Sequence, residues 1–475
     1  MDGLDIEEIQ LANLENSFTL GAEYYGKIYI STANTIKKLN HKTLHSISKV
    51  ITDGDHGSPD YQDSGVLYLL SESVQEGYID TSKCRFITQK KNAELKRSEL
   101  HPRNIVVTKT GVYFGKSAVI PSNICKANMI AHVGKIELKD GYNPYYVSTF
   151  LNSKYGYYQM RRRGIKATRP EIKLVEFPEI MIPIFSNVFD RSIESTIENA
   201  IKILSVSDDT MRDCETNILN AVGFKADASP YSGYSIRLLG ESFCKSGRLD
   251  AEYYQPKYDE YWRQLQEFET TSIPTEYEVF KNSGTNYADG VNDIGVIKTK
   301  QLGNNGIDTN GVESYFTIQA CIENKSTYLR KNDVVFASMG VGSLGKVSLF
   351  SSDGEKQFVT DSTLRIYRAK TSCRVLPEVL CVFLQSHLGQ EMIYRYVVGS
   401  TGIINIYDDD MAKIPIPILN MDAQKEIATK VQESFALRKQ SKQLLEYAKQ
   451  AVEMAIEQGE EVALEWLKEK IPAEV

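Results

Sequence analysis

Residues 20–25 read Leu-Gly-Ala-Glu-Tyr-Tyr, and residues 249–254 read Leu-Asp-Ala-Glu-Tyr-Tyr, a shift of 229 positions. Further matches follow in the same order with a slowly drifting shift: Gly65–Leu67 with Gly295–Ile297, Asn104–Val107 with Asp333–Phe336, Phe150–Ser153 with Phe383–Ser386, and Ile182–Ile184 with Ile414–Ile416. Chance does not preserve such an order along a chain. The sequence therefore predicts a tandem duplication with a period of about 230 residues.

The composition is that of a folded protein with more than one domain. The chain has 475 residues, of which 42% are hydrophobic and 25% charged, so two to four domains are expected. Its acidic start lacks a signal-peptide core, and no apolar run reaches membrane-helix length. The seven cysteines are dispersed without a CxxC spacing, which favours reduced thiols. We therefore expect a cytoplasmic protein.

The net charge of −7 does not exclude nucleic acid as a ligand. DNA binding requires Lys and Arg on one local face, where they displace counterions from the phosphates. The charge of the whole chain says little about such a face. Composition thus leaves DNA binding open without supporting it.

Each copy has the same order of parts. A segment of mixed strands, turns and short helices comes first, which predicts an α+β domain, and a long amphipathic helix follows. The predicted boundaries are 1–186 for the first domain, 187–223 for its helix, 224–420 for the second domain, 421–458 for the second helix, and 459–475 for a tail without an assigned role.

Both long helices carry an apolar seam. The predicted seam positions are Ile193, Ile197, Leu204, Met211 and Ile218 in the first helix and Ile427, Val431, Leu445 and Val452 in the second. Asp422 is expected to cap the second helix. Each helix could pack on its own domain alone. We favour antiparallel pairing as a coiled coil with approximate twofold symmetry, because an isolated stripe of this length must be buried. The pair would make a spacer of roughly 50 Å.

The chain resembles the specificity subunit of type I restriction-modification systems. The resemblance rests on Thr52–Pro59, Asn104–Gly111, Asn143-Pro144 and the Ile-Pro-Ile runs that lead into the helices. It covers nearly the whole chain, and the repeated order of the motifs is more specific than any one of them. Thr52–Pro59 has only a loose counterpart near residues 287–291, so the two copies should read different sequences.

The resemblance implies two target-recognition domains, each reading one half of a split site on double-stranded DNA. It implies a chain without catalytic residues or cofactors, because methylation and cleavage would belong to two adenine methyltransferase subunits and to motor-nuclease subunits. Two alternatives stay open: a specificity module of another methylation-based phage-defence system, and a stand-alone DNA-modifying enzyme.

Within this reading, cations and hydroxyls on glycine-hinged loops and at helix ends are candidates for DNA contacts. A solvated helix face and a plain hairpin are the alternatives. The candidates in the first copy are Lys109, Thr110, Tyr113, Lys116, Arg161, Arg162, Arg163, Lys166 and Arg169. Those in the second copy are Ser338, Ser343, Lys346, Arg395, Ser400 and Thr401.

Three motifs suggest other chemistry and are better explained without it. Gly340–Lys346 nearly spells a phosphate-binding loop, but the next residues predict a strand where such a loop needs a helix. Asn143-Pro144-Tyr145-Tyr146 faintly resembles a methyltransferase motif, yet a proline at a helix start explains it. The cluster of Asp53, Asp55 and His56 is more typical of a turn than of a metal site, and no metal is expected.

Overall fold

The computed structural model describes residues 21–164, 170–226, 235–283, 294–352, 354–399 and 403–471. The chain divides into two units, of which unit 1 comprises residues 1–203 and 439–475 and unit 2 comprises residues 204–438. Each unit thus combines a mixed domain with half of each long helix. The predicted boundaries had instead kept the helices whole and apart from the domains.

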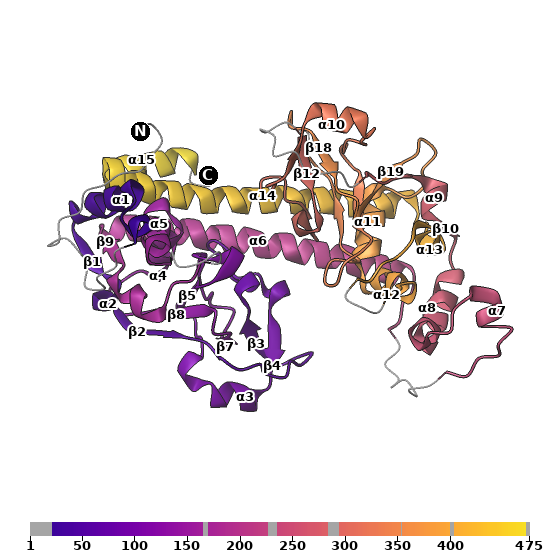
Figure 1. The fold of residues 1–475 in the computed structure, drawn as a ribbon, viewed down its shortest axis with the longest axis horizontal. Coiled ribbons are helices and arrows are strands. Elements are labelled where there is room, and N and C mark those ends of the chain that lie inside the picture. Colours follow the sequence, from indigo (N-terminus) through magenta and orange to yellow (C-terminus); the bar gives the residue numbers. More distant parts are fainter. Residues whose placement is uncertain are drawn as a thin grey trace. The chain divides into compact units, whose positions relative to one another are not determined.

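The elements of unit 1 that precede the first long helix alternate short helices with short strands (Figure 1). The helices are α1 (Lys27–Lys37), α2 (Leu44–Ile47), α3 (Gln89–Glu94), α4 (Pro144–Asn152) and α5 (Lys154–Arg163). The strands are β1 (His41–Thr43), β2 (Ser48–Asp53), β3 (Val66–Leu69), β4 (Arg85–Ile87), β5 (Ile105–Thr108), β6 (Ser117–Val119), β7 (Ala127–Met129), β8 (Val133–Leu138) and β9 (Met181–Pro183).

Unit 2 repeats this list with small changes. Its helices are α7 (Phe243–Ser246), α8 (Pro256–Gln266), α9 (Ile273–Glu276), α10 (Ile318–Glu323), α11 (Pro377–Gln385), α12 (His387–Arg395) and α13 (Asp408–Met411). Its strands are β10 (Thr270–Thr271), β11 (Tyr277–Phe280), β12 (Ile294–Ile297), β13 (Leu302–Gly303), β14 (Gly306–Ile307), β15 (Tyr315–Phe316), β16 (Val334–Ala337), β17 (Val347–Leu349), β18 (Phe358–Thr360), β19 (Leu364–Ala369) and β20 (Ile416–Pro417). The long helices are α6 (Asn187–Ala221) and α14 (Met421–Gln458), and α15 (Glu460–Lys470) follows.

The sheets prove that both copies have one fold. Unit 1 has a four-stranded sheet in the order β2-β8-β5-β6, a three-stranded sheet β4-β3-β7 and the pair β1-β9. Unit 2 has β11-β19-β16-β17, β15-β12-β18 and β10-β20 in the same roles. In each three-stranded sheet the central strand has one antiparallel and one parallel neighbour. The predicted duplication and α+β class are confirmed.

The inner strands β5 and β16 of the two four-stranded sheets are buried on both faces. In unit 1, Ile105 and Val107 point into a core shared with α4, α5 and the long helices, whereas Val106 points into a smaller core against β3 and β7. In unit 2, Val334 and Phe336 face the helices and Val335 faces the smaller core. A strand covered on both sides reads as a continuous apolar run, which explains the repeated Ile-Val-Val pattern.

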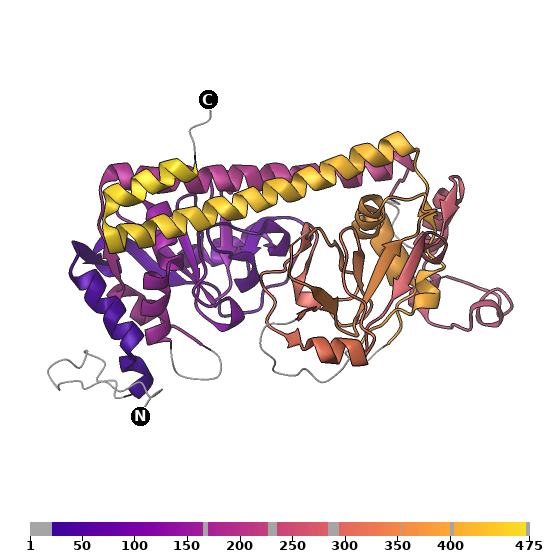
Figure 2. The same cartoon turned by 90° about the horizontal axis from the view of Figure 1, so that it is seen from above.

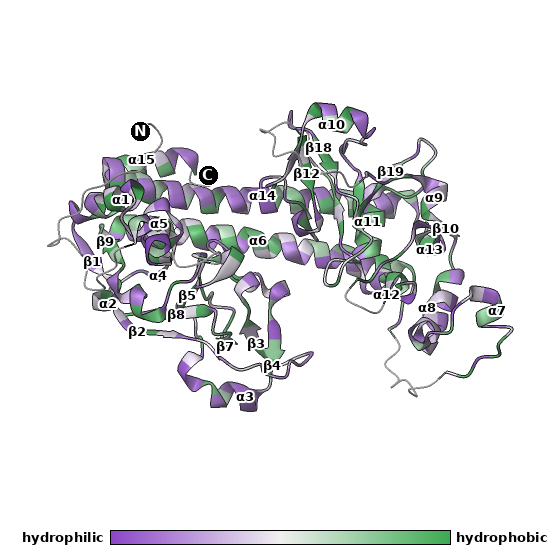
Figure 3. Ribbon diagram, viewed as in Figure 1, coloured by the Kyte–Doolittle hydropathy of each residue, from purple (hydrophilic) through white to green (hydrophobic). Residues whose placement is uncertain are grey.

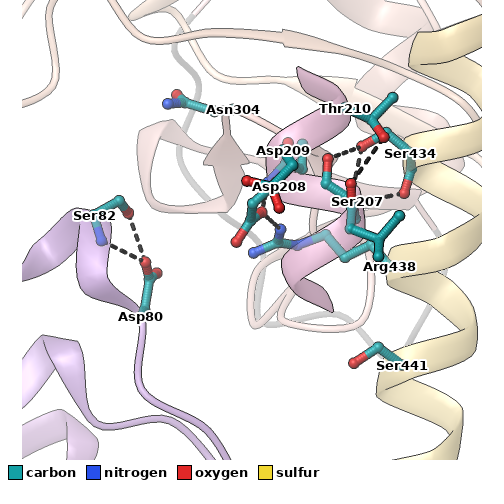
Figure 4. A network of polar contacts seen from close by, with 12 residues as sticks. Asp80, Ser82, Ser207, Asp208, Asp209, Thr210, Asn304, Ser434, Arg438 and Ser441 are labelled. Atoms are coloured by element: carbon teal, nitrogen blue, oxygen red, sulfur yellow. Dashed lines mark hydrogen bonds and ion pairs between the residues drawn. The ribbon is translucent and has the colours of Figure 1, made fainter. Parts of the chain in front are cut away.

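The long helices pair within each unit (Figure 2). In unit 1, Ser441 Oγ donates a hydrogen bond to Ala200 O over 2.7 Å. In unit 2, Ser207 and Ser434 each donate to the other's backbone carbonyl over 3.0 Å (Figure 4). The partner number falls as the position number rises, so the helices run antiparallel as predicted. Hydroxyls that bond the facing backbone need small residues at the contact, and these set the register.

The predicted seam positions are buried with one exception. The exception is Leu445, which is only partly buried. Among the buried positions, Leu204 and Met211 are the most exposed, at 7% and 9%. Arg438, which interrupts the apolar pattern, pairs with Asp208 over 2.6 Å (Figure 4). Apolar and polar residues alternate along α6 (Figure 3), as the seam requires.

The caps of the long helices correct one prediction. Asn420 Oδ1 accepts a hydrogen bond from Ala423 N, so Asn420 caps α14 and Asp422 does not. Ser186 caps α6 at the corresponding place, since its Oγ accepts from Phe189 N. Asp422 lies within the first turn, where its negative charge stabilises the helix by interacting with the helix dipole, although it is not the cap.

The tail after α14 forms a helix that belongs to unit 1. Ala463 and Leu467 of α15 are buried in the core of that unit, and Glu460 accepts a hydrogen bond from Ser186 N at the start of α6. The sequence had left this segment unassigned. It completes the first core over the ends of both long helices.

An acidic cluster at this contact predicts a pH effect on stability. Burial, with the charges of Glu460 and Glu194, raises the pKa of Asp190 to about 7. Because this folded-state pKa exceeds the ordinary value, protonation favours the folded state, and stability falls as the pH rises from about 4 to about 7. Asp190→Asn should therefore raise the melting temperature of unit 1 by a few degrees at pH 8 and by much less at pH 5.

The control for this prediction is Asp213→Asn, which removes an exposed carboxylate from the same helix. It should leave the melting temperature unchanged at both pH values. Equal melting temperatures for wild type and Asp190→Asn at pH 8 would contradict the prediction.

Candidate nucleic-acid interface

The loop from Lys109 to Lys116 joins β5 to β6 and packs against the end of α5. Phe114 meets Tyr157 of α5 edge to face at 6.3 Å, and Gly111 N donates to Pro170 O. A Cβ on Gly164, just after α5, would lie 3.0 Å from the Phe114 ring. Two candidate segments that are about fifty residues apart in sequence therefore form one continuous surface in unit 1.

Lys109 is not part of that surface. Its side chain is 8% exposed, and its Nζ lies 2.7 Å from Asp53 Oδ2. Arg97 and His56 also approach Asp53, at 3.3 and 3.5 Å. Burial acts to raise the pKa of Asp53, but the hydrogen bond from Lys109 and its positive charge, with a contribution from Arg97, outweigh burial and lower the pKa. Lys109 thus neutralises a buried carboxylate instead of facing solvent.

Asp53, Asp55 and His56 form an ion-paired turn. Asp55 accepts a hydrogen bond from Gly57 N and lies 3.5 Å from Lys91 Nζ. Across the described residues, no group of three His, Cys, Asp or Glu side chains is arranged to hold a metal ion. Lys109 and Arg97 pair with Asp53, and Lys91 pairs with Asp55, so the charges of both aspartates are balanced within the fold.

Arg162 and Arg395 are equivalent in the two units and have the same structural role. The Arg162 guanidinium lies 4.1 Å from the ring centroid of Tyr24, and its Nε donates to Tyr24 O. The Arg395 guanidinium lies 5.0 Å from the ring of Tyr253. Both tyrosines belong to the repeated Ala-Glu-Tyr-Tyr segment, so these cation–π contacts tie that segment to α5 and α12.

The other candidates of unit 1 lie closer to solvent. Thr110 is half-buried, and its backbone forms an isolated antiparallel β-bridge with Glu171. Lys116 is half-buried, with its Nζ 2.8 Å from Gln75 Oε1 and 5.2 Å from the Tyr113 ring. Arg161 and Arg163 are half-buried at the end of α5, and Arg163 donates to Tyr24 Oη. Lys166 and Arg169 lie outside the described residues.

The equivalent loop of unit 2 joins β16 to β17. Ser338 is 1% exposed and donates to Thr363 O, so it is structural. Ser343 is half-buried and Lys346 is exposed. The loop contacts α12 through Gln390, whose Nε2 donates to Gly345 O. Ser400 and Thr401 lie outside the described residues.

Two suspected motifs have the structures expected from sequence. Gly340–Lys346 leads into strand β17, so no helix N-terminus is available to hold a phosphate there. Asn143 caps α4, accepting hydrogen bonds from Tyr145 N and Tyr146 N, and Pro144 occupies the first helical position. Pro377 begins α11 in the same way.

A basic stretch that our sequence analysis did not select lies beside the Asp53 turn. Lys90, Lys91, Lys96 and Arg97 are carried by α3 and the short 3-10 helix Lys96–Ser98 that follows it. The signal in the sequence was four cations within eight residues. Residues 154–173 contain more lysines and arginines, so a count of basic residues favours that segment over this one.

Residues 276–447 match the family model described as the type I restriction modification DNA specificity domain. This chain carries a type I restriction-modification DNA specificity domain. The resemblance predicted from the sequence is thereby confirmed, and with it a role in DNA recognition within a type I restriction-modification system. Because unit 1 repeats the sheets and helices of unit 2, the specificity fold occurs twice.

Solved structures give weaker likenesses to this chain. The HsdS subunit from Thermoanaerobacter tengcongensis is 10% identical over 88% of this chain and 97% of its own, with a TM-score of 0.29. The type I S subunit from M. genitalium is 11% identical over 92% of this chain and 97% of its own, with a TM-score of 0.30. No curated protein matches the sequence significantly. Within the described residues, no helix has both the length and the apolar character to span a membrane.

Proposed function

We propose that this chain is the DNA-recognition subunit of a type I restriction-modification complex and that each unit reads one half of a bipartite site. The observation that carries the proposal is one specificity fold present twice with different surface chemistry. In the second loop, Met339 stands in place of Thr110, and Gly342 and Ser343 stand in place of Tyr113. Equivalent loops that differ in this way suit different half-sites.

The paired long helices support a spacer role. Serines bonded to facing carbonyls hold α6 and α14 in one register. A fixed register favours a fixed number of unread base pairs between the half-sites. Approximate twofold symmetry of the two units remains part of the proposal.

The proposed DNA contacts are the exposed and half-buried candidates. In unit 1 these are Thr110, Tyr113, Lys116, Arg161 and Arg163, and in unit 2 Ser343 and Lys346. Lys166, Arg169, Ser400 and Thr401 remain candidates from sequence. Lys109, Arg162 and Ser338 are left out because they are buried, and the half-buried Arg395 is left out because its guanidinium packs against the ring of Tyr253.

We further propose that the chain is non-catalytic and acts in the cytoplasm. Methylation would come from two adenine methyltransferase subunits bound to it, and cleavage from motor-nuclease subunits. The two units offer a duplicated surface, which favours two copies of a methyltransferase partner.

Mapping methyladenine in the host genome, with and without the gene for this chain, tests the proposal. We expect a motif of two short words separated by an unread gap, lost on deletion and restored by the wild-type gene. An uninterrupted motif, or a methylation pattern that deletion leaves unchanged, would contradict it.

A further inference from the structure

The segment of unit 1 from Thr88 to Asn104, here named the basic arm, presents a layer of cations over a layer of buried carboxylates. Asp53, Asp55 and Glu99 are only 10 to 12% exposed. Two of the side chains that pair with them reach outward, since Arg97 is 61% exposed and His101 51% exposed, whereas Lys109 is buried with Asp53. Apart from Glu94, which is exposed, the acidic groups lie beneath and most of the basic groups of the arm face solvent, so the surface is more positive than the composition suggests.

Hydrogen bonds hold Arg97 in place and leave it able to bind another anion. Its two terminal nitrogens contact Thr52 Oγ1 at 2.7 Å and Asp53 Oδ1 at 3.3 Å. A guanidinium carries five N–H donors, so donors remain on its exposed side. Lys90 and Lys96, which both precede Arg97 in the sequence, are exposed. A cation fixed in this way loses little side-chain entropy when it meets a phosphate.

A chain of buried amides fixes the arm to the sheet. Ser98 Oγ donates to Asn128 Oδ1, Asn128 Nδ2 donates to Asn92 Oδ1, and Asn92 Nδ2 donates to Glu99 Oε2. Lys135 of β8 adds a hydrogen bond to Glu99 O over 2.7 Å. These contacts join α3 and the 3-10 helix to β7 and β8, so the cations project from a rigid base.

The corresponding segment of unit 2, residues 317–333, has the same elements and different chemistry. Both begin with a threonine cap, Thr88 in unit 1 and Thr317 in unit 2. At the equivalent positions Gln319 replaces Lys90, Ala320 replaces Lys91 and Ser326 replaces Arg97. Lys325 keeps the charge of Lys96, so three of these four cations are particular to unit 1 and are not a requirement of the shared fold.

We propose that the basic arm binds the phosphate backbone of duplex DNA and gives unit 1 most of the salt-dependent attraction between the chain and its site. This rests on the proposed function. The large exposed apolar side chains of the described chain include none from residues 88–104. Protein interfaces usually require apolar anchors, whereas phosphate contacts require Lys and Arg. DNA is therefore favoured over an acidic protein partner.

The test uses the full chain assembled with its methyltransferase partner. Binding to duplexes with the mapped site and with a scrambled site is measured over a range of salt concentrations for wild type and for Lys90→Ala/Lys96→Ala. The double variant should lower the slope of log affinity against log salt by about 2, roughly 1 for each lost phosphate contact. Both duplexes should be weakened alike.

The matched control is Lys37→Ala/Lys38→Ala, which removes two exposed charges from the end of α1 in the same unit. It should leave the slope unchanged. The single variants Lys90→Gln and Lys96→Gln, each expected to lower the slope by about 1, preserve the test if the double variant loses stability.

An unchanged slope in the arm variants would overturn the proposal, as would weaker binding to the mapped site alone. Loss of the methyltransferase from the assembly would assign the arm to a protein partner and also overturn it. If wild type bound both duplexes equally, the proposed function would fail, while the slope would still decide whether the arm contacts phosphate.

Discussion

Gly389→Ala should strongly destabilise unit 2, because the added methyl group has no room in the folded state. A Cβ on Gly389 would lie 2.0 Å from Phe383 O and 2.8 Å from Leu384 Cα. Both neighbours are backbone atoms, so no side-chain rotation relieves the clash. Ser386 Oγ bonds both Gly389 N and Phe383 O, which holds α11 and α12 close at this corner. We expect a loss of about 3 kcal/mol or more in unfolding free energy, measured by denaturant titration.

The same corner occurs in unit 1, where a Cβ on Gly156 would lie 2.2 Å from Phe150 O. Gly156→Ala should therefore destabilise unit 1 by a similar amount. Gly240→Ala is the control, because a Cβ there meets no atom within 4 Å. An unfolding midpoint for Gly389→Ala equal to that of the control would show that the corner can open at no cost.

Lys109→Met should destabilise unit 1 by about 3 kcal/mol, because removing one partner of a buried ion pair leaves the other uncompensated. Asp53 is 10% exposed and Lys109 8%, so water reaches neither group easily. Methionine keeps the length of the side chain and removes its charge. Denaturant titration with a probe in unit 1 measures the change.

Adding Asp53→Asn to Lys109→Met should recover much of the loss, since the uncompensated carboxylate is then gone. Lys173→Met, at an exposed position, serves as the control. If Lys109→Met kept full stability and instead lowered the salt dependence of DNA binding, Lys109 would be a DNA contact after all and the buried pair would be unimportant.

The fold was predictable because it is repeated. The order of matches from Leu20 to Ile184 and from Leu249 to Ile416 predicted the duplication, and the apolar seams predicted the long helices to within two residues of α6 and α14. The division of the helices between the units could not be read from the chain, since it depends on which halves pack against which core.

The site was less predictable, because the sequence does not show whether a basic side chain faces solvent or pairs with a buried partner. Arg162 looked like a DNA contact in a run of arginines, and the structure places it on Tyr24. Lys109 looked equally available and lies over Asp53. Arg97 was missed although it is exposed, since the carboxylates that orient it are distant in sequence.

The division of the chain has a consequence for synthesis on the ribosome. Unit 2 is one uninterrupted stretch, residues 204–438, whereas unit 1 needs both its first 203 residues and the stretch after Arg438. Unit 1 therefore begins to be synthesised first, but its last residues are synthesised after unit 2 is complete. Until Ala448 and Leu467 emerge, the first core is exposed on one side, and nascent chains should depend on chaperones during that interval.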